Sequence, residues 1–226
     1  EKNLKFYIEQ GFKLTKIHNV IKFKQKPFLK EYIDFNTEKR KNAKNEFEKD
    51  FFKLANNSVF GKTMENVDKR KDIRLKSELK AEAYVKRPNF ISRTIFDKDL
   101  IACHMAKLKV KQDKPIYVGF TILELSKLLM YGFHYNQIGH IDKKLYYGDT
   151  DSLIYGLKDD PYGEKGLIRN NMDLFDTSDL PNTHICYSLT NKKVVGKFKD
   201  ELKGIKMREF IALRSKNYCY QTEKDE

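Results

Sequence analysis

The sequence predicts an α+β fold, and three segments carry that prediction. Residues 38–60 have a helix-forming composition without Pro or Gly, until Gly61 supplies a stop. Residues 117–132 are apolar on most faces, which is typical of a helix buried against a sheet. Two β-rich runs, 144–147 and 152–155, are joined by turn-forming residues and predict a β-hairpin. We therefore expect an antiparallel sheet backed by helices.

The other segments give weaker patterns. Residues 6–28 place apolar residues between lysines and end at a Pro, which predicts a strand at the edge of a sheet. Asn36-Thr37 offers an N-cap, so the simplest reading is one long helix of about 24 residues. Residues 67–114 mix basic clusters with short apolar stretches and receive no assignment. We expect 158–183 to be an irregular surface segment and 192–220 to be strand-like.

The chain is strongly basic. Its 226 residues include 45 Lys and Arg against 32 Asp and Glu, for a formal charge of +13 at pH 7. A positive field spread over the surface suits a polyanion, so nucleic acid is the leading partner. A Lys-rich proteome would explain the same composition, and charge alone does not decide between the two readings.

The spacing of the cysteines and the length of the apolar segments indicate where the protein works. Cys103, Cys186 and Cys219 lie far apart and outside any CxxC pair, which argues against a disulfide framework and a four-ligand zinc site. A reducing intracellular setting fits best. No apolar run approaches the ~18 residues of a membrane span, and the first residues form no signal peptide, so we expect no secretion and no membrane partner. The chain starts at Glu1 without an initiating Met, which predicts a fragment or a processed product.

The predicted hairpin carries two carboxylates at its tip, Asp149 and Asp151. Because they stand two apart in nearly extended chain, we expect both to leave the backbone on the same side. Convergent carboxylates bind hard cations such as Mg²⁺, which takes oxygen ligands and keeps its other positions for water and phosphate oxygens. A polar hairpin tip without a metal is the commoner explanation of an Asp-Thr-Asp turn on its own. The neighbouring residues decide between these readings.

Those neighbours resemble the motifs of family B DNA polymerases. Residues 147–152, Tyr-Gly-Asp-Thr-Asp-Ser, match motif C of that family letter for letter. Upstream, residues 53–61 resemble motif B, KxxxNSxYG, with the same spacing of Lys, Asn-Ser and Gly. Downstream, residues 216–218 look like the family's KxY motif, and residues 195–201 resemble the segment that precedes it. Several motifs in the right order make this resemblance specific.

Residues 61–66, which follow motif B, make the chain most similar to the protein-primed branch, found in Maverick/Polinton elements, linear plasmids and some viruses and phages. The resemblance covers residues 28–66, 115–156 and 192–221. It implies a polymerase palm with a fingers helix and the start of the thumb. The implied parts are a palm-edge segment (1–37), a fingers helix with motif B (38–66), a palm with the motif C hairpin (67–191) and a palm-to-thumb segment with KxY (192–226).

The resemblance also implies roles for individual residues. Asp149 and Asp151 would be catalytic and would hold two Mg²⁺ ions, with Mn²⁺ as an alternative, and Asp151 would bind both ions. Lys53 would meet the triphosphate of the incoming nucleotide. Lys49, one turn earlier on the same face, and Arg40, at the helix start, would extend this positive stripe. For these last two residues, a solvated helix face is the alternative.

Asn57 and Phe60 would line the pocket for the nascent base pair. The family usually carries Tyr at the position of Phe60, so the ring is kept while any hydrogen bond from the hydroxyl is lost. Core packing is the alternative for this ring. The residues implied to contact DNA are Ser58, Gly61, Tyr147, Thr150, Lys216 and Tyr218. Ordinary strand surface is the alternative for Lys216 and Tyr218.

One catalytic motif of the family is missing. Motif A, DxxSLYPS, supplies a third carboxylate, and no such string occurs before Lys53; Asp34 lacks the Ser-Leu-Tyr-Pro context. The sequence before Lys53 is also too short to contain the carboxylate motifs of the family's exonuclease domain. We therefore expect a fragment of a DNA-directed DNA polymerase, which adds deoxynucleotides to a primer 3′ end and is inactive alone. Its partners would be primer-template DNA, deoxynucleoside triphosphates and a terminal priming protein.

Two other functions stay open. A DNA-binding remnant of a mobile-element polymerase would keep the basic surface without the chemistry, and salt-dependent DNA binding without a divalent-metal site would favour it. A metal-dependent nuclease or an RNA polymerase-like palm would use the same hairpin. A nuclease needs no triphosphate-binding helix, however, so the block at 53–61 argues against it.

Overall fold

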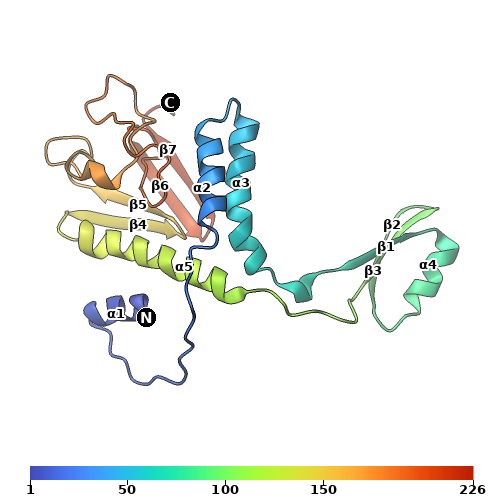
Figure 1. Ribbon diagram of the computed structural model, residues 1–226. Helices are drawn as coiled ribbons and strands as arrows, with labels where there is room; N and C mark the ends of the chain where they lie inside the picture. The colour runs from blue at the N-terminus through green and yellow to red at the C-terminus, as the bar shows by residue number, and fades with distance from the viewer. Residues whose placement is uncertain (226) are drawn as a thin grey trace. The chain divides into compact units, whose positions relative to one another are not determined.

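A computed structural model describes residues 1–225 of the chain (Figure 1). It combines helices with three small antiparallel sheets, which confirms the α+β class. The chain forms two compact units: the larger comprises Glu1–Asn56 and Thr121–Glu226, and the smaller comprises Asn57–Phe120.

The segment expected to be one helix folds as two, α2 (Lys30–Lys41) and α3 (Glu46–Thr63). The expected N-cap, Asn36, instead lies inside α2, where it is buried. Gly61 does not end the second helix, which continues to Thr63. These boundaries were wrong because composition alone does not show which of several Asn residues caps a helix.

Asn45 starts α3. Its side-chain oxygen accepts a hydrogen bond from the backbone N–H of Glu48 at 2.8 Å, and the Glu48 carboxylate accepts one from the N–H of Lys44 at 3.0 Å. The first bond satisfies a backbone donor that has no partner within the first turn of the helix, and the second holds the residue before the cap. The chain therefore stops one helix and starts another within four residues.

Two hydrogen bonds join α2 to α3, one from a side chain to the backbone and one between side chains. The Tyr32 hydroxyl donates to the carbonyl of Ala55 at 3.3 Å, and the Asn56 amide donates to the hydroxyl of Thr37 at 3.2 Å. The side chain of Asn36 is buried on the same helix as Thr37. The two helices thus form one paired element.

Two hairpins belong to the larger unit. β4 (Lys143–Asp149) pairs antiparallel with β5 (Ser152–Leu157), which confirms the predicted hairpin. β6 (Met207–Arg214) pairs antiparallel with β7 (Asn217–Thr222). The strand-like prediction for 192–220 holds only from β6 onward, because turns and irregular chain precede that strand.

α5 (Ile116–Tyr131) confirms the helix expected at 117–132, and one turn of π-helix, η2 (Gly132–Gln137), follows it. By length and composition, the 22 residues from Ile116 to Gln137 could cross a membrane, which corrects the expectation that no apolar run approaches that length. A single such helix is weak evidence for a membrane span. Only 17% of its apolar window is buried, so the expectation of a helix buried against a sheet is wrong.

The main core of the larger unit lies beside η2. The Phe133 ring stacks on Phe198, with centroids 4.0 Å apart. The segment 158–183, with its short 3-10 helix η3 (Arg169–Leu174), was expected to lie on the surface, yet it supplies buried residues to this core. Its apolar residues are hidden in the sequence among Asp, Asn, Pro and Gly. The buried cluster consists of Phe133, Ile138, Leu167, Ile168 and Phe175.

The strand expected over residues 6–28 is wrong. The structure has a helix, α1 (Lys2–Glu9), followed by irregular chain over 13–27. The Asn3 amide fixes this helix to α5 by donating to the carbonyl and the carboxylate of Glu124 at 2.7 and 2.9 Å. An alternating pattern becomes a strand only when another strand pairs with it, and none does so within the described residues.

The smaller unit contains the segment that received no assignment. Its antiparallel sheet has the order β1 (Asp72–Lys76), β3 (Leu100–Met105), β2 (Phe90–Asp97), and α4 (Glu78–Val85) follows the first strand. Alternate residues of the central strand face the helix, as the period of two in a strand requires. The buried cluster they form with α4 consists of Ala81, Ile101, Cys103 and Met105.

Glu65 contacts the chain segment before that sheet, through Arg70, and the segment after it, through Lys114. Its carboxylate accepts hydrogen bonds from the Arg70 guanidinium at 2.6 and 2.9 Å, just after the 3-10 turn η1 (Val67–Lys69). It also forms an ion pair with Lys114 at 3.2 Å. Arg70 first, and Lys114 second, lower the pKa of Glu65 to about 2.

Asn45→Ala should lower the free energy of unfolding by about 1 kcal/mol, because loss of the cap leaves a backbone N–H of α3 without its partner. Asn42→Ala is the matched control, since Asn42 caps α2 through its backbone N–H, bonded to the Glu38 carbonyl. The control should change stability by less than about 0.5 kcal/mol. Urea unfolding followed by circular dichroism measures both, and equal losses would contradict the capping role.

Glu65→Gln should lower the thermal midpoint at neutral pH, and the gap to the wild type should close in acid. The pKa of Glu65 is depressed to about 2 from 4.5, so its contribution is complete above about 4.5 and is lost as the pH falls toward about 2. Glu82→Gln removes the same charge from an exposed position of α4 and serves as the control. Melting curves between pH 2 and pH 7 test this; a gap that does not depend on pH would refute the ionic role.

Candidate active site

The tip of the β4–β5 hairpin holds Asp149 and Asp151 in a tight turn. Asp149 pairs with Ser152 at the ends of the two strands, and the N–H of Asp151 donates to the Asp149 carbonyl at 2.6 Å. Thr150 has a φ of 51°, in the left-handed region, so the chain between the two aspartates is not extended. The expectation that period-two alternation aligns the carboxylates is therefore wrong, and a turn positions them instead.

Asp149 makes two side-chain contacts at this tip. Lys216 Nζ lies 2.5 Å from its Oδ2, and the Thr150 hydroxyl donates to its Oδ1 at 3.0 Å. Lys216 first, and Thr150 second, lower the pKa of Asp149. In return, Asp149 raises the pKa of Lys216, and Tyr147 and Asp151 add smaller contributions of the same sign. The ammonium group therefore lies near both carboxylates.

Lys216 comes from the second hairpin. It occupies the turn between β6 and β7 with a φ of 60°, and its N–H donates to the Tyr147 hydroxyl at 2.8 Å. The Tyr147 ring contacts Tyr218 and Phe210, at centroid distances of 5.0 and 5.7 Å. The structure thus brings the KxY residues to motif C. It also adds Phe210, which the sequence analysis missed although it lies in the strand-like run before KxY.

The residues expected to bind the nucleotide are divided between α2 and α3. Lys53 is exposed on α3, and Lys49, one turn earlier, forms an ion pair with Glu46 at 2.9 Å. Arg40 lies in the last turn of α2 and not at the start of the motif B helix. The expectation of a positive stripe along one helix is therefore wrong, because Arg40 belongs to α2 and the two lysines belong to α3.

Asn57, Ser58, Phe60 and Gly61 follow on α3, where the chain enters the smaller unit. Asn57 and Ser58 are exposed, and the Phe60 ring is half-buried. No atom lies within 4 Å of the place that a Cβ would take at Gly61, so packing within the described chain does not require a glycine there.

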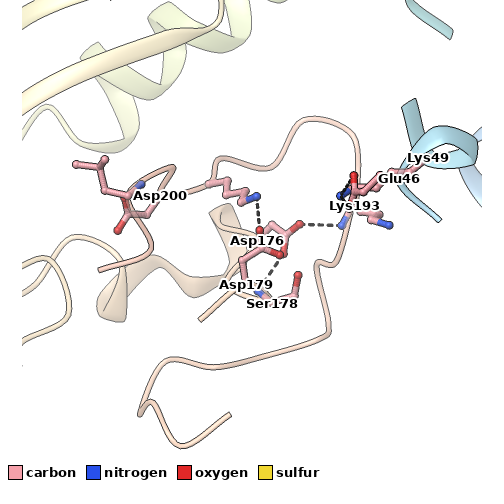
Figure 2. Close-up of polar contacts among 9 residues, drawn as sticks. Glu46, Lys49, Asp176, Ser178, Asp179, Lys193 and Asp200 are labelled. Atoms are coloured by element: carbon pink, nitrogen blue, oxygen red, sulfur yellow. Dashed lines mark hydrogen bonds and ion pairs between the residues drawn. The ribbon is translucent and has the colours of Figure 1, made fainter. Parts of the chain in front are cut away.

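Lys193 was not expected near the nucleotide-binding residues. Its Nζ donates to the carbonyl of Arg40 at 3.1 Å, although 153 residues separate the two in the chain. Figure 2 shows it beside Lys49 and Glu46. The only hint in the sequence is a Lys-Lys pair before the 195–201 segment, which does not reveal a contact over such a distance.

Asp149 and Asp151 are suitable ligands for Mg²⁺. Both offer carboxylate oxygens, and Mg²⁺ is usually held by one or two carboxylates, with water and phosphate oxygens in its other positions. Within residues 1–225, no group of three or more His, Cys, Asp or Glu side chains could hold a metal. A metal at this hairpin would therefore need oxygen ligands beyond these two carboxylates.

A family model described as DNA polymerase type B, organellar and viral, matches residues 1–139. This chain belongs to that family. The match includes the motif B block on α3 and ends before the β4–β5 hairpin. Because the family is one of DNA polymerases, the general function of this type B chain is that of a DNA polymerase. The family implies DNA and deoxynucleoside triphosphates as substrates. No curated protein and no solved structure matches it.

In this polymerase chain, Phe210→Ala should lower the free energy of unfolding by about 1–2 kcal/mol, because aromatic pairs such as those with Tyr147 and Tyr218 contribute about 0.5–1.5 kcal/mol each. Leu213→Ala on the same strand is the control, since Leu213 is 80% exposed and its loss should cost less than about 0.5 kcal/mol. Urea unfolding compares the two. Equal midpoints would mean that the ring contacts do not hold the hairpins together.

Proposed function

We propose that this chain carries the nucleotidyl-transfer site of a DNA-directed DNA polymerase, which adds deoxynucleotides to a primer 3′ end as a template directs. One observation supports this most directly: Asp149 and Asp151 lie at the tip of a hairpin with the motif C sequence, in a chain that belongs to the type B family. Paired carboxylates at an exposed tip suit phosphoryl transfer with metal ions.

Asp149 and Asp151 would hold two Mg²⁺ ions, with Mn²⁺ as an alternative, and Asp151 would bind both. When bound, the ions stabilise negative charge on the attacking and leaving oxygens of the phosphoryl group. The contacts from Lys216 and Thr150 keep Asp149 ionised and restrict its rotation, so this carboxylate is already oriented for an incoming cation. Asp151 is exposed and open to substrate.

Lys53, Lys49 and Arg40 would bind the triphosphate of the incoming nucleotide. Their ammonium and guanidinium groups attract and orient a polyanion without taking part in bond making. Asn57 and Phe60 would line the pocket for the nascent base pair. The Phe60 ring offers a flat apolar surface for shape selection, and it has no hydroxyl to donate to the minor groove.

Lys216 and Tyr218 would hold the primer strand near its terminus, and four further residues would contact DNA. The Lys216 ammonium is 73% exposed although it pairs with Asp149, so one side of it is open to a primer phosphate. Such contacts position the strand and do not read its sequence. The four further residues are Ser58, Gly61, Tyr147 and Thr150.

Within the family, we place the chain in the protein-primed, Maverick/Polinton-like branch, working inside the cell with a terminal priming protein as a partner. The motif residues that support this branch are 61–66. We also propose that catalysis needs the third carboxylate of motif A, for which no matching string precedes Lys53, so that these 226 residues alone are inactive.

A DNA-binding remnant without catalysis is the second candidate. The formal charge of +13 favours DNA binding with or without chemistry. Among residues 1–225, no third His, Cys, Asp or Glu joins the two aspartates in a metal-holding group. This candidate differs from the first in requiring no metal and no nucleotide.

The deciding experiment is primer extension with deoxynucleoside triphosphates and Mg²⁺. It compares the 226-residue chain, the same chain joined to the adjoining upstream coding sequence, and Asp151→Asn in both. We expect extension only from the longer polypeptide with Asp151 intact. Asp151→Asn should lose about 10²–10³-fold in rate, as enzymes do when one group that stabilises developing charge is removed.

DNA binding by the same polypeptides, measured at several salt concentrations, separates the two candidates. If the longer polypeptide binds DNA but never extends the primer, the catalytic assignment fails and the remnant is the better account. If Asp151→Asn extends as well as the wild type, the motif C carboxylates are not the catalytic ones.

A further inference from the structure

Three cationic side chains meet where α2 ends, and one of them comes from far along the chain. Lys193 Nζ donates to the carbonyl of Arg40 at 3.1 Å. Figure 2 shows Lys193 next to Lys49 and Glu46 of α3. The segment that follows the β4–β5 hairpin therefore reaches the helices that carry the proposed nucleotide-binding residues.

The backbone fixes Lys193 at this point. Its N–H donates to Asp176 Oδ2 at 2.8 Å, and its φ is 55°. Asp176 is itself held, because its other carboxylate oxygen accepts from the N–H of Ser178 at 3.1 Å and its own N–H donates to the Phe198 carbonyl at 2.7 Å. The backbone at Lys193 is therefore held in place, and the bond from Nζ to the Arg40 carbonyl directs the ammonium.

Positive charge exceeds negative charge around this ammonium. Glu46 is engaged by Lys49 at 2.9 Å, and no carboxylate lies within ion-pair distance of Lys193 in the described chain. The Nε of Arg40 is buried and has no hydrogen-bond acceptor among residues 1–225. Burial first, then Arg40, Lys49 and Lys192, lower the pKa of Lys193, and the smaller opposing effect of Asp179 does not cancel them. A bound anion would relieve the repulsion among these cations.

We propose that Arg40, Lys49 and Lys193 form a binding site for a polyphosphate, in which Lys193 is a substrate-binding residue supplied by the later segment. This rests on the proposed function, where the polyphosphate is the triphosphate of the incoming nucleotide. The phosphates of a DNA backbone share this chemistry but carry single charges spaced along a strand. Three cations in one cluster match the concentrated charge of a triphosphate better.

The test is calorimetric binding of inorganic tripolyphosphate, of a deoxynucleoside triphosphate and of a short DNA duplex to the full chain. Lys193→Gln removes the charge, keeps a polar end and shortens the side chain by one atom, and it should weaken tripolyphosphate binding about tenfold, the effect of one lost charge-assisted contact. Lys193→Arg should restore most of the affinity. Lys203→Gln is the matched control, because Lys203 is an exposed lysine with a φ of 54° in a turn of the same segment.

The proposal is overturned if Lys193→Gln binds tripolyphosphate as the wild type does, or if Lys203→Gln loses as much affinity. It is also overturned if only duplex binding weakens, since the site would then serve the DNA backbone. A lower melting temperature of Lys193→Gln with unchanged affinity would mean that the side chain only caps α2.

Failure of this inference is distinguishable from failure of the proposed function, because tripolyphosphate binding involves no chemistry. If Lys193→Gln weakens binding while the longer polypeptide never extends a primer, the anion site stands without the polymerase reaction. If extension depends on Asp151 but Lys193→Gln changes neither affinity nor KM for the nucleotide, the function stands and the anion site fails.

Discussion

A two-stranded β-hairpin is marginally stable in water, and this chain builds its candidate site from two of them. The rings of Tyr147, Phe210 and Tyr218 cover the place where the hairpins meet, and the hydroxyl of Tyr147 accepts the N–H of Lys216. The position of Asp149 therefore depends on β6 and β7 as much as on its own strand. Disturbing either hairpin should disturb the carboxylates.

The helices α2 and α3 also depend on a segment that is distant in the chain. α2 and α3 carry the residues proposed for the triphosphate, yet the Arg40 carbonyl is met by a lysine from the loop that precedes β6. That loop is anchored by Asp176, next to the buried Phe175 of the main core. Core, loop and helices in the larger unit are thus linked, so a change in the core can move a charge at the helices.

The sequence predicted the hairpin with Asp149 and Asp151 because its signals are local: turn-forming residues lie between two β-rich runs, and a six-residue motif spans them. Helix boundaries failed because Asn36 and Asn45 are equally good caps by type, and only packing buries the first and leaves the second at a helix start. The strand expected over 6–28 failed for lack of a partner strand, which no local pattern can reveal.

Contacts between residues far apart in the chain could not be predicted from the sequence for a related reason. Nothing in the residues around Lys216 or Lys193 indicates that one would meet Asp149 and the other the end of α2, because those contacts join positions 67 and 153 residues apart. The resemblance to motif C and KxY pointed to residues that lie together on the two hairpins. The ion pair between them and the ring of Phe210 came only from the structure.

Thr150, Lys193 and Lys216 all have positive φ, a conformation that costs about 1–2 kcal/mol for a residue with a Cβ and almost nothing for glycine. At these three turns the chain keeps side chains that bind or pair where glycine would relax the backbone. Stability and the proposed function are therefore opposed at the same positions. A screen that selected variants only for heat resistance should enrich glycine there, and it would remove the side-chain contacts of the proposed sites while relaxing the backbone.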